Sequence, residues 1–451
     1  MIRLCCALLL VLVATIPAHA RESVLDIKQV TSPGGITAWL VEDHSVPVLA
    51  VSFAFKGAGS ILDPADKQGL ARMVSNTLDE GAGDLDAQAF QKALRDDAIE
   101  LSFSATRDDF TGSLRTVTAN APRAFELLQM ALLKPRFDDE AIGRMREANQ
   151  SRIRSSLSDP DWVAARIMND RIFEGHPYAR NSGGTLSSLD TIMAADIRGF
   201  HAQYLGRNNL VIAVAGDITA DQLAGALDTV FGKLPEVTLP PVPQKVEQTN
   251  AGQTYVFEKD IPQSVIQITQ PGIDHRDPDY HLAHVMNFVL GSSGFGSRLT
   301  EVIREQRGLT YGIYSSLMTM RFFNGLTVST STENKNTATM LDLIKQEWAK
   351  MKETPITPKE LADAQSYLIG SLPLSLTSTD DIAGLMLGLQ LDELPHDYLD
   401  IRAAAIKAAT PEAIQRVARK ILDENKMTAI VVGKPEGLPQ AQIITTIPNA
   451  E

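Results

Sequence analysis

The chain has 451 residues, of which 55 are acidic and 42 are basic, and its formal net charge at pH 7 is −13. Such an acidic chain is unsuited to nucleic acid, where basic stripes supply most of the affinity, and it is repelled by anionic lipid surfaces. Hydrophobic residues make up 44% of the sequence, which is ordinary for a globular chain, and the length is enough for two or three domains.

Residues 1–20 have the features of a secretory signal. A short basic start precedes an apolar run over residues 4–13, and Ala-His-Ala at 18–20 matches a small-x-small cleavage site. The run is shorter than the roughly 20 residues of a membrane span, which disfavours a retained anchor. We expect cleavage after Ala20, a periplasmic location and no membrane span in the mature chain. Both cysteines lie inside the signal, which excludes disulfides, a thiolate zinc site and a cysteine nucleophile from the mature chain.

Residues 21–235 show the pattern of a first domain that mixes strands and helices. Segments that alternate with period two, or are rich in β-branched and aromatic residues, predict strands at 37–42, 48–55, 101–105, 110–117 and 209–214. Apolar positions at helical spacing predict helices at 67–80, 86–97, 120–132, 138–157, 161–173, 194–204 and 220–230.

A proline-containing stretch at 236–250 has no helical or strand period, and we interpret it as a linker. Residues 251–436 then repeat the order of the first domain, with a predicted helix at 279–290 and strands at 254–258, 264–269, 311–318, 325–331 and 427–433. The sequence therefore predicts an α+β fold of two similar domains, with helices packed on antiparallel-rich sheets. The polar residues 437–451 are predicted to form a loose tail.

Several short motifs occur in one order along the chain. Residues 69–76 read Gly-Leu-Ala-Arg-Met-Val-Ser-Asn, and further markers lie at 42–47, 175–178, 216–218 and 291–311. In this order and spacing the chain resembles the pitrilysin/insulinase family of zinc metallopeptidases, also called mitochondrial-processing-peptidase-like. The resemblance covers nearly all of the mature chain. It implies two homologous domains of the LuxS- and processing-peptidase-like metallohydrolase type.

The zinc motif of that family is degenerate here. Active members carry His-x-x-Glu-His on a helix, where two histidines bind zinc and the glutamate activates a metal-bound water. Alignment through Gly69 places Arg72, Ser75 and Asn76 at those positions, and the more distant glutamate ligand falls near residues 151–152. None of these side chains replaces a zinc ligand set, and Arg72 would repel a cation. We therefore expect no metal or other cofactor in this chain, and zinc in a partner subunit.

Other histidines offer weaker metal sites. His281 and His284 are three residues apart on a predicted helix, with His275 upstream, and that spacing permits two ligands on one face. We favour the alternative that these are solvated histidines on a surface helix. His176 and His44 are interpreted as structural and turn residues.

A second motif is intact. The resemblance aligns Arg304 and Tyr311 with the arginine and tyrosine that active peptidases bring from their C-terminal half onto the zinc site. A guanidinium suits a peptide carbonyl or carboxylate, and a tyrosine hydroxyl can donate to the oxyanion of a tetrahedral intermediate. The alternatives are that Arg304 pairs with Glu301 or Asp342 and that Tyr311 is a strand aromatic. Arg298 is interpreted as a structural residue of the helix start.

A chain that keeps the arginine and tyrosine of the active site but lacks the zinc ligands is expected to work with a partner that supplies them. We predict that the chain is the non-zinc subunit of a heterodimeric periplasmic metallopeptidase, inactive alone, which supplies Arg304 and Tyr311 to a zinc-motif paralogue that cleaves unfolded peptides. One alternative is a non-catalytic peptide- or protein-binding scaffold of the same fold, and another is a stand-alone enzyme with an unrecognised site. We expect no nucleic-acid partner.

Overall fold

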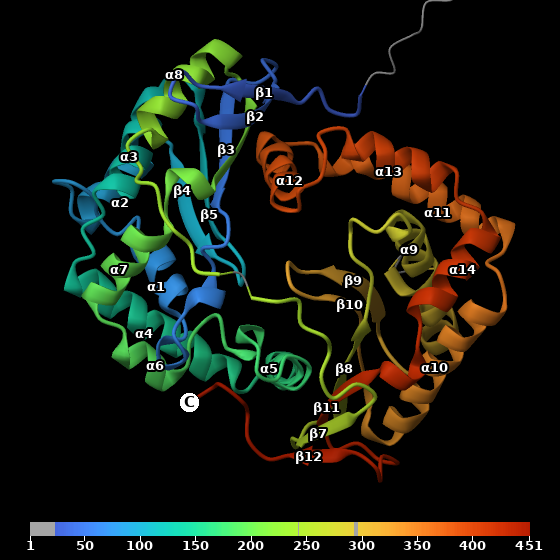
Figure 1. Ribbon diagram of the computed structural model, residues 1–451. Helices are drawn as coiled ribbons and strands as arrows, with labels where there is room; N and C mark the ends of the chain where they lie inside the picture. The colour runs from blue at the N-terminus through green and yellow to red at the C-terminus, as the bar shows by residue number, and fades with distance from the viewer. Residues whose placement is uncertain (1–22, 242, 293–295) are drawn as a thin grey trace, which may run out of the picture.

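Two α+β halves face each other in the structure of the chain, a computed structural model that describes residues 23–241, 243–292 and 296–451 (Figure 1). The predicted signal at 1–20 lies outside the described residues, as do residues 293–295 of the motif at 291–311. Across the described ranges, no helix is both long enough and apolar enough to cross a membrane.

The first half is built on a six-stranded sheet with the order β1-β2-β6-β3-β5-β4. Its strands are β1 (Lys28–Thr31), β2 (Thr37–Glu42), β3 (Val48–Phe55), β4 (Glu100–Ala105), β5 (Phe110–Val117) and β6 (Leu210–Gly216). Its helices are α1 (Leu70–Thr77), α2 (Ala87–Asp96), α3 (Ala121–Leu133), α4 (Asp139–Ser156), α5 (Pro160–Ile172), α6 (Leu186–Thr191), α7 (Ala194–Tyr204) and α8 (Ala220–Phe231). Within this sheet, as far as the residues are described, β2 and β6 alone pair in parallel, so the predicted antiparallel-rich sheet is confirmed.

The second half repeats this design with the order β12-β7-β11-β8-β10-β9. Its strands are β7 (Thr254–Glu258), β8 (Gln263–Pro271), β9 (Ile313–Thr319), β10 (Asn324–Glu333), β11 (Thr428–Gly433) and β12 (Gln442–Ile444). Its helices are α9 (Tyr280–Asn287), α10 (Thr337–Glu353), α11 (Pro358–Gly370), α12 (Thr379–Leu391), α13 (Tyr398–Lys407) and α14 (Pro411–Ile421), with π-helical segments at Phe288–Ser292 and Thr300–Glu305. The two orders match strand for strand except at one edge, where β12 takes the place of β1. The predicted pair of similar domains is thus confirmed.

The sequence of β3 shows how the first sheet separates its two faces. Large residues such as Phe53 and Phe55 point to one face, where they are fully buried against the helices of the same half. The small residues Ala50 and Ala54 lie on the opposite face, in a separate apolar cluster with α12. Small side chains on a sheet allow a helix to approach it closely, so this face is shaped for a covering helix.

That covering helix comes from the other half of the chain. Helix α12 packs on β3 and β6 of the first sheet, with Ala383 and Met386 fully buried. Helix α5 packs in turn on β8 and β11 of the second sheet, with Ile167 fully buried in the same cluster as Ile430. Each half therefore supplies the helix that covers the inner face of its neighbour (Figure 1).

The C-terminal residues 437–451 are not the loose tail that the sequence predicts. Residues 442–444 form β12, which pairs in parallel with β7. Beyond it the chain returns to the first half, where the Asn449 amide donates to the Ala179 carbonyl at 3.2 Å and the Gln68 amide donates to Asn449 at 3.2 Å. Ala450 is only 2% exposed. These partners lie more than 250 residues away in sequence, so local polarity could not indicate them.

Candidate functional site

Helix α1 carries the zinc-motif positions, and its start is held by a buried carboxylate. Gly69 precedes the helix with φ of 90°, and a Cβ there would lie 2.7 Å from Gly184. The Asp63 carboxylate accepts hydrogen bonds at 2.9 Å from the backbone N–H groups of Gly69 and Ala71. Burial raises the pKa of Asp63 to about 7, although the backbone donors at the helix start act in the opposite direction. Sequence analysis missed Asp63, which no local motif marks.

The structure places the three degenerate positions on one face of α1, opposite α4. The Ser75 hydroxyl donates to the backbone carbonyl of Arg72 at 2.9 Å, so it turns back onto its own helix. The Asn76 side-chain amide donates to the side-chain oxygen Oδ1 of Asn149 on α4 at 3.0 Å. Arg152, near which the distant ligand was expected, donates to the same oxygen at 3.3 Å. Asn149 was missed, although it lies one helical turn before Arg152 and so on the same face of α4.

This set of side chains does not fit a zinc ion. It offers two guanidinium groups, two amides and a hydroxyl, with no imidazole, thiolate or carboxylate. Burial lowers the pKa of Arg72, and the nearby charge of Arg152 lowers it further, so the site is already crowded with positive charge. Across the parts of the chain that are described, no group of three or more His, Cys, Asp and Glu side chains is placed to hold a metal.

Arg304 and Tyr311 lie side by side. Arg304 is on the π-helical segment Thr300–Glu305, and its guanidinium lies 5.4 Å from the centre of the Tyr311 ring. Its Nε lies 3.4 Å from a carboxylate oxygen of Glu305, which is a different acidic residue from the Glu301 or Asp342 of the structural alternative. Tyr311 precedes β9 and is 90% exposed, so its hydroxyl is open to a ligand.

Hydrogen bonds from β10 hold the loop that connects the segment Thr300–Glu305 to β9. The Thr332 hydroxyl donates to the Leu309 carbonyl at 2.7 Å, and the Thr330 hydroxyl donates to the Gly312 carbonyl at 2.9 Å. Arg298 forms a two-pronged ion pair with Glu360 at 2.7 and 3.0 Å, which ties the segment to α11 and fits the structural role expected of it.

The histidines of the described ranges do not assemble a metal site, and one expectation about them is wrong. His284 is not solvated: burial lowers its pKa to about 4, and its Nδ1 is inaccessible to solvent. His281 packs against the Tyr398 ring at 5.3 Å, and the Nε2 of His275 lies 3.0 Å from the Asp392 carbonyl. His176 accepts from the backbone N–H of residue 178 at 3.1 Å, which agrees with a structural role.

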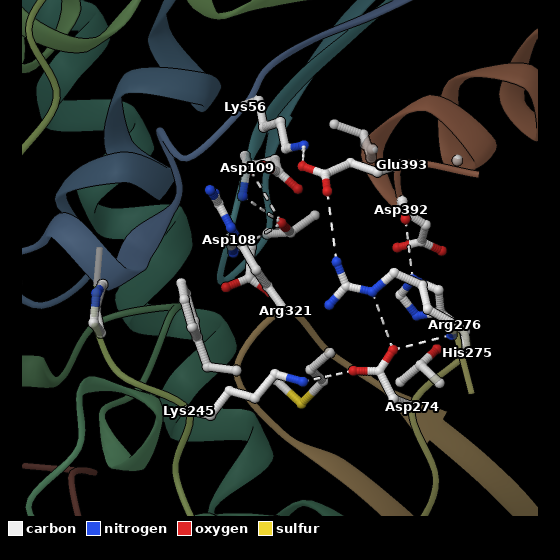
Figure 2. A pocket seen from close by; sticks show the side chains of 17 residues that line it. Lys56, Asp108, Asp109, Lys245, Asp274, His275, Arg276, Arg321, Asp392 and Glu393 are labelled. Atoms are coloured by element: carbon white, nitrogen blue, oxygen red, sulfur yellow. Dashed lines mark hydrogen bonds and ion pairs between the residues drawn. The ribbon is translucent and has the colours of Figure 1, made fainter. Parts of the chain in front are cut away.

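A charged cavity of about 440 Å³ lies where the two halves and the linker meet (Figure 2). Glu393, after α12, pairs with Lys56 of the first half at 2.6 Å and with Arg276 at 3.5 Å. Asp274 pairs with Arg276 at 3.2 Å and with Lys245 of the linker at 2.6 Å. The chain of ion pairs therefore joins four separate stretches of the sequence, at residues 56, 245, 274–276 and 393.

This chain of ion pairs contributes little to stability because its members are solvent-accessible. We expect Glu393→Gln to lower the free energy of unfolding by about 0.2–1 kcal/mol in dilute buffer, and by less in 1 M salt. Chemical denaturation at the two salt concentrations measures the difference. Glu147→Gln removes an exposed carboxylate from α4 and serves as the control; an equal effect from it would show that only net charge matters.

Comparisons with known proteins agree with this geometry. A family profile described as "Peptidase M16 inactive domain" matches residues 191–368, a range that contains Arg304 and Tyr311. The Helicobacter pylori protein named non-peptidase homolog YmxG is 30% identical over 338 residues, which span 74% of this chain and 77% of that protein. A solved structure of a peptidase M16 inactive domain from Pseudomonas fluorescens is 28% identical, with a TM-score of 0.85, and the match covers 93% of this chain and 100% of that one. The periplasmic protease PqqL of Escherichia coli has the same fold at 15% identity, with a TM-score of 0.77 over 92% of this chain and 46% of PqqL.

Proposed function

The chain belongs to the peptidase M16 family, and we propose that within it the chain is the non-zinc subunit of a heterodimeric periplasmic metallopeptidase. In this proposal a partner chain with an intact His-x-x-Glu-His motif holds the zinc and the general base. This chain supplies Arg304 and Tyr311 to the shared site. The substrates are unfolded peptides.

The observation that carries the proposal is the contrast between the two motifs. The zinc-motif positions and the α4 side chains beside them include two guanidinium groups and two amides, while the guanidinium of Arg304 lies over a Tyr311 ring that is 90% exposed. A hydroxyl at that exposure can donate to the oxyanion that forms when a peptide bond is attacked. The guanidinium can donate in a fork to a substrate carbonyl or carboxylate. Zinc in the partner would supply the activated water.

Pairing and export have separate support. The match to PqqL covers 92% of this chain but only 46% of that periplasmic protease, so this chain has the size of one half of that molecule. A heterodimer of this chain with a second chain of similar size would have about the length of PqqL. The signal features of residues 1–20 agree with export.

A scaffold that binds peptides without cleaving them is the second candidate. It is favoured by the name of the H. pylori relative, a non-peptidase homolog. A scaffold needs no oxyanion donor, so it gives no reason for an exposed tyrosine to lie beside a guanidinium.

We expect the purified chain to hold no stoichiometric zinc and to hydrolyse no peptide, because its zinc-motif positions carry no metal ligands. Addition of a zinc-motif paralogue from the same organism should produce chelator-sensitive cleavage of an unstructured peptide. Metal analysis and peptide turnover measure the two outcomes. About one zinc per chain, with activity in the absence of a partner, would refute the proposal. A paralogue that binds the chain but is equally active without it would favour the scaffold.

A further inference from the structure

The degenerate motif has gained charge as well as lost ligands. Arg72 on α1 and Arg152 on α4 are close enough for the charge of one to lower the pKa of the other. Among the described residues, the Arg72 guanidinium makes no hydrogen bond or ion pair, and its Nε is shielded from solvent. In the cavity of Figure 2, by contrast, each of the three linked cations has a carboxylate partner.

The polar groups around these arginines have more donors than acceptors. The side-chain oxygen Oδ1 of Asn149 accepts from both Asn76 and Arg152, at 3.0 and 3.3 Å. The Asn149 amide donates to the sulfur of Met73 at 3.2 Å, which holds the amide in this orientation. Among the described residues, the Nε of Arg72 has no acceptor, and the only acceptor of the exposed Arg152 is this Asn149 oxygen. A buried donor without an acceptor and two like charges that repel each other are both unfavourable, unless a ligand completes the site.

We propose that this face of α1 and α4 is a binding site for a peptide carboxylate, built on the positions where related peptidases hold zinc. A carboxylate has two acceptor oxygens in one plane, so it matches the fork of a guanidinium and neutralises the like charges. The choice of a peptide rests on the proposed function, but the site itself does not require a partner subunit. The carboxylate can be the C-terminus of a peptide or the side chain of Asp or Glu.

Direct binding to the purified chain tests the proposal. Three fluorescent peptides of the same length are compared by anisotropy: one with a free C-terminus and no acidic residue, one amidated with a central Glu, and one amidated with Gln in its place. We expect one or both of the carboxylate peptides to bind more tightly than the third. Which of them does so identifies the source of the carboxylate. Equal affinity for all three would overturn the proposal.

Substitutions locate the site. Arg152→Gln changes an exposed side chain, and Arg72→Gln changes the half-buried one. Each should weaken the carboxylate peptides by about 10- to 100-fold, as expected for losing a hydrogen bond to a charged group, and should leave the third peptide unaffected. Arg154→Gln, on an exposed position of the same helix, is the control and should change nothing. If Arg72→Gln does not fold, Arg152→Gln alone decides, because its side chain lies on the surface.

An equal loss from Arg154→Gln would show that binding follows net charge, and the proposal would fail. The measurement uses neither a partner nor turnover. Its failure is therefore separable from the failure of the shared active site.

Discussion

Replacing Tyr311 with phenylalanine is expected to lower the kcat of the reconstituted heterodimer by about 100- to 1000-fold. The phenolic hydroxyl is the oxyanion donor in the proposed site, and loss of one such donor removes roughly 2.7–4 kcal/mol of transition-state stabilisation. The fold should be unaffected, because the ring is 90% exposed and only its hydroxyl is removed. Steady-state kinetics on an unstructured peptide measure the effect, with complex formation checked by size-exclusion chromatography.

Two further variants make this result specific. Tyr314→Phe removes a hydroxyl from the neighbouring tyrosine on β9, which is 53% exposed, and should leave kcat within about twofold of the wild type. Arg304→Ala should raise KM as well as lower kcat, because a charged hydrogen bond to the substrate is lost in both ground and transition states. Neither change should alter the zinc content of the partner. Wild-type turnover from a Tyr311→Phe, Arg304→Ala double variant would show that the chain acts as a scaffold.

Met386→Ala is expected to lower the free energy of unfolding by about 2–5 kcal/mol, the usual range for deleting a large buried side chain. Met386 is fully buried between α12 and the first sheet, so the cavity opens at the contact between the two halves. Both halves should therefore lose stability together. Urea denaturation, followed by a probe in each half, measures whether the two transitions remain coincident.

Gly384→Ala on the same helix is the matched control. A methyl group added at Gly384 meets no atom within 4 Å, and alanine is favoured over glycine inside a helix by about 0.5–1 kcal/mol. This substitution should therefore be neutral or stabilising. A loss of stability from Gly384→Ala comparable to that from Met386→Ala would show that α12 is sensitive to any change, and the packing argument would fail.

The spacing of hydrophobic residues predicted most of the fold, because half-buried strands and helices each repeat their apolar residues with a characteristic period. The alternation that predicts a strand at 110–117 matches β5, and the predicted strand at 209–214 overlaps β6, which runs over Leu210–Gly216. The exchange of α5 and α12 could not be predicted in the same way, because an apolar helix face does not identify the sheet that it covers. The docking of the C-terminal residues depends on amide contacts such as Asn449 with Ala179, which carry no periodic signal.

Some residues of the candidate site could likewise be predicted from the sequence, and others could not. Family resemblance identified Arg304 and Tyr311, and the structure brings them into contact. It also identified Arg72 as incompatible with zinc. The role of Asn149 depends on the relative placement of α1 and α4, which sequence spacing alone does not fix. That the Nε of Arg72 has no acceptor within the described part of the chain could be seen only once its surroundings were known.

The exchange of α5 and α12 between the two halves indicates a route by which such a chain can arise. A single half on its own would expose the small-residue face of its sheet, where Ala50 and Ala54 lie beneath α12. Two copies of one ancestral half could bury both faces by exchanging that helix, as domain-swapped dimers do. By that route the present chain would correspond to two such copies joined by the linker at 236–250. Cleavage within that linker should leave two fragments that remain associated, so the chain is a candidate for split-protein complementation.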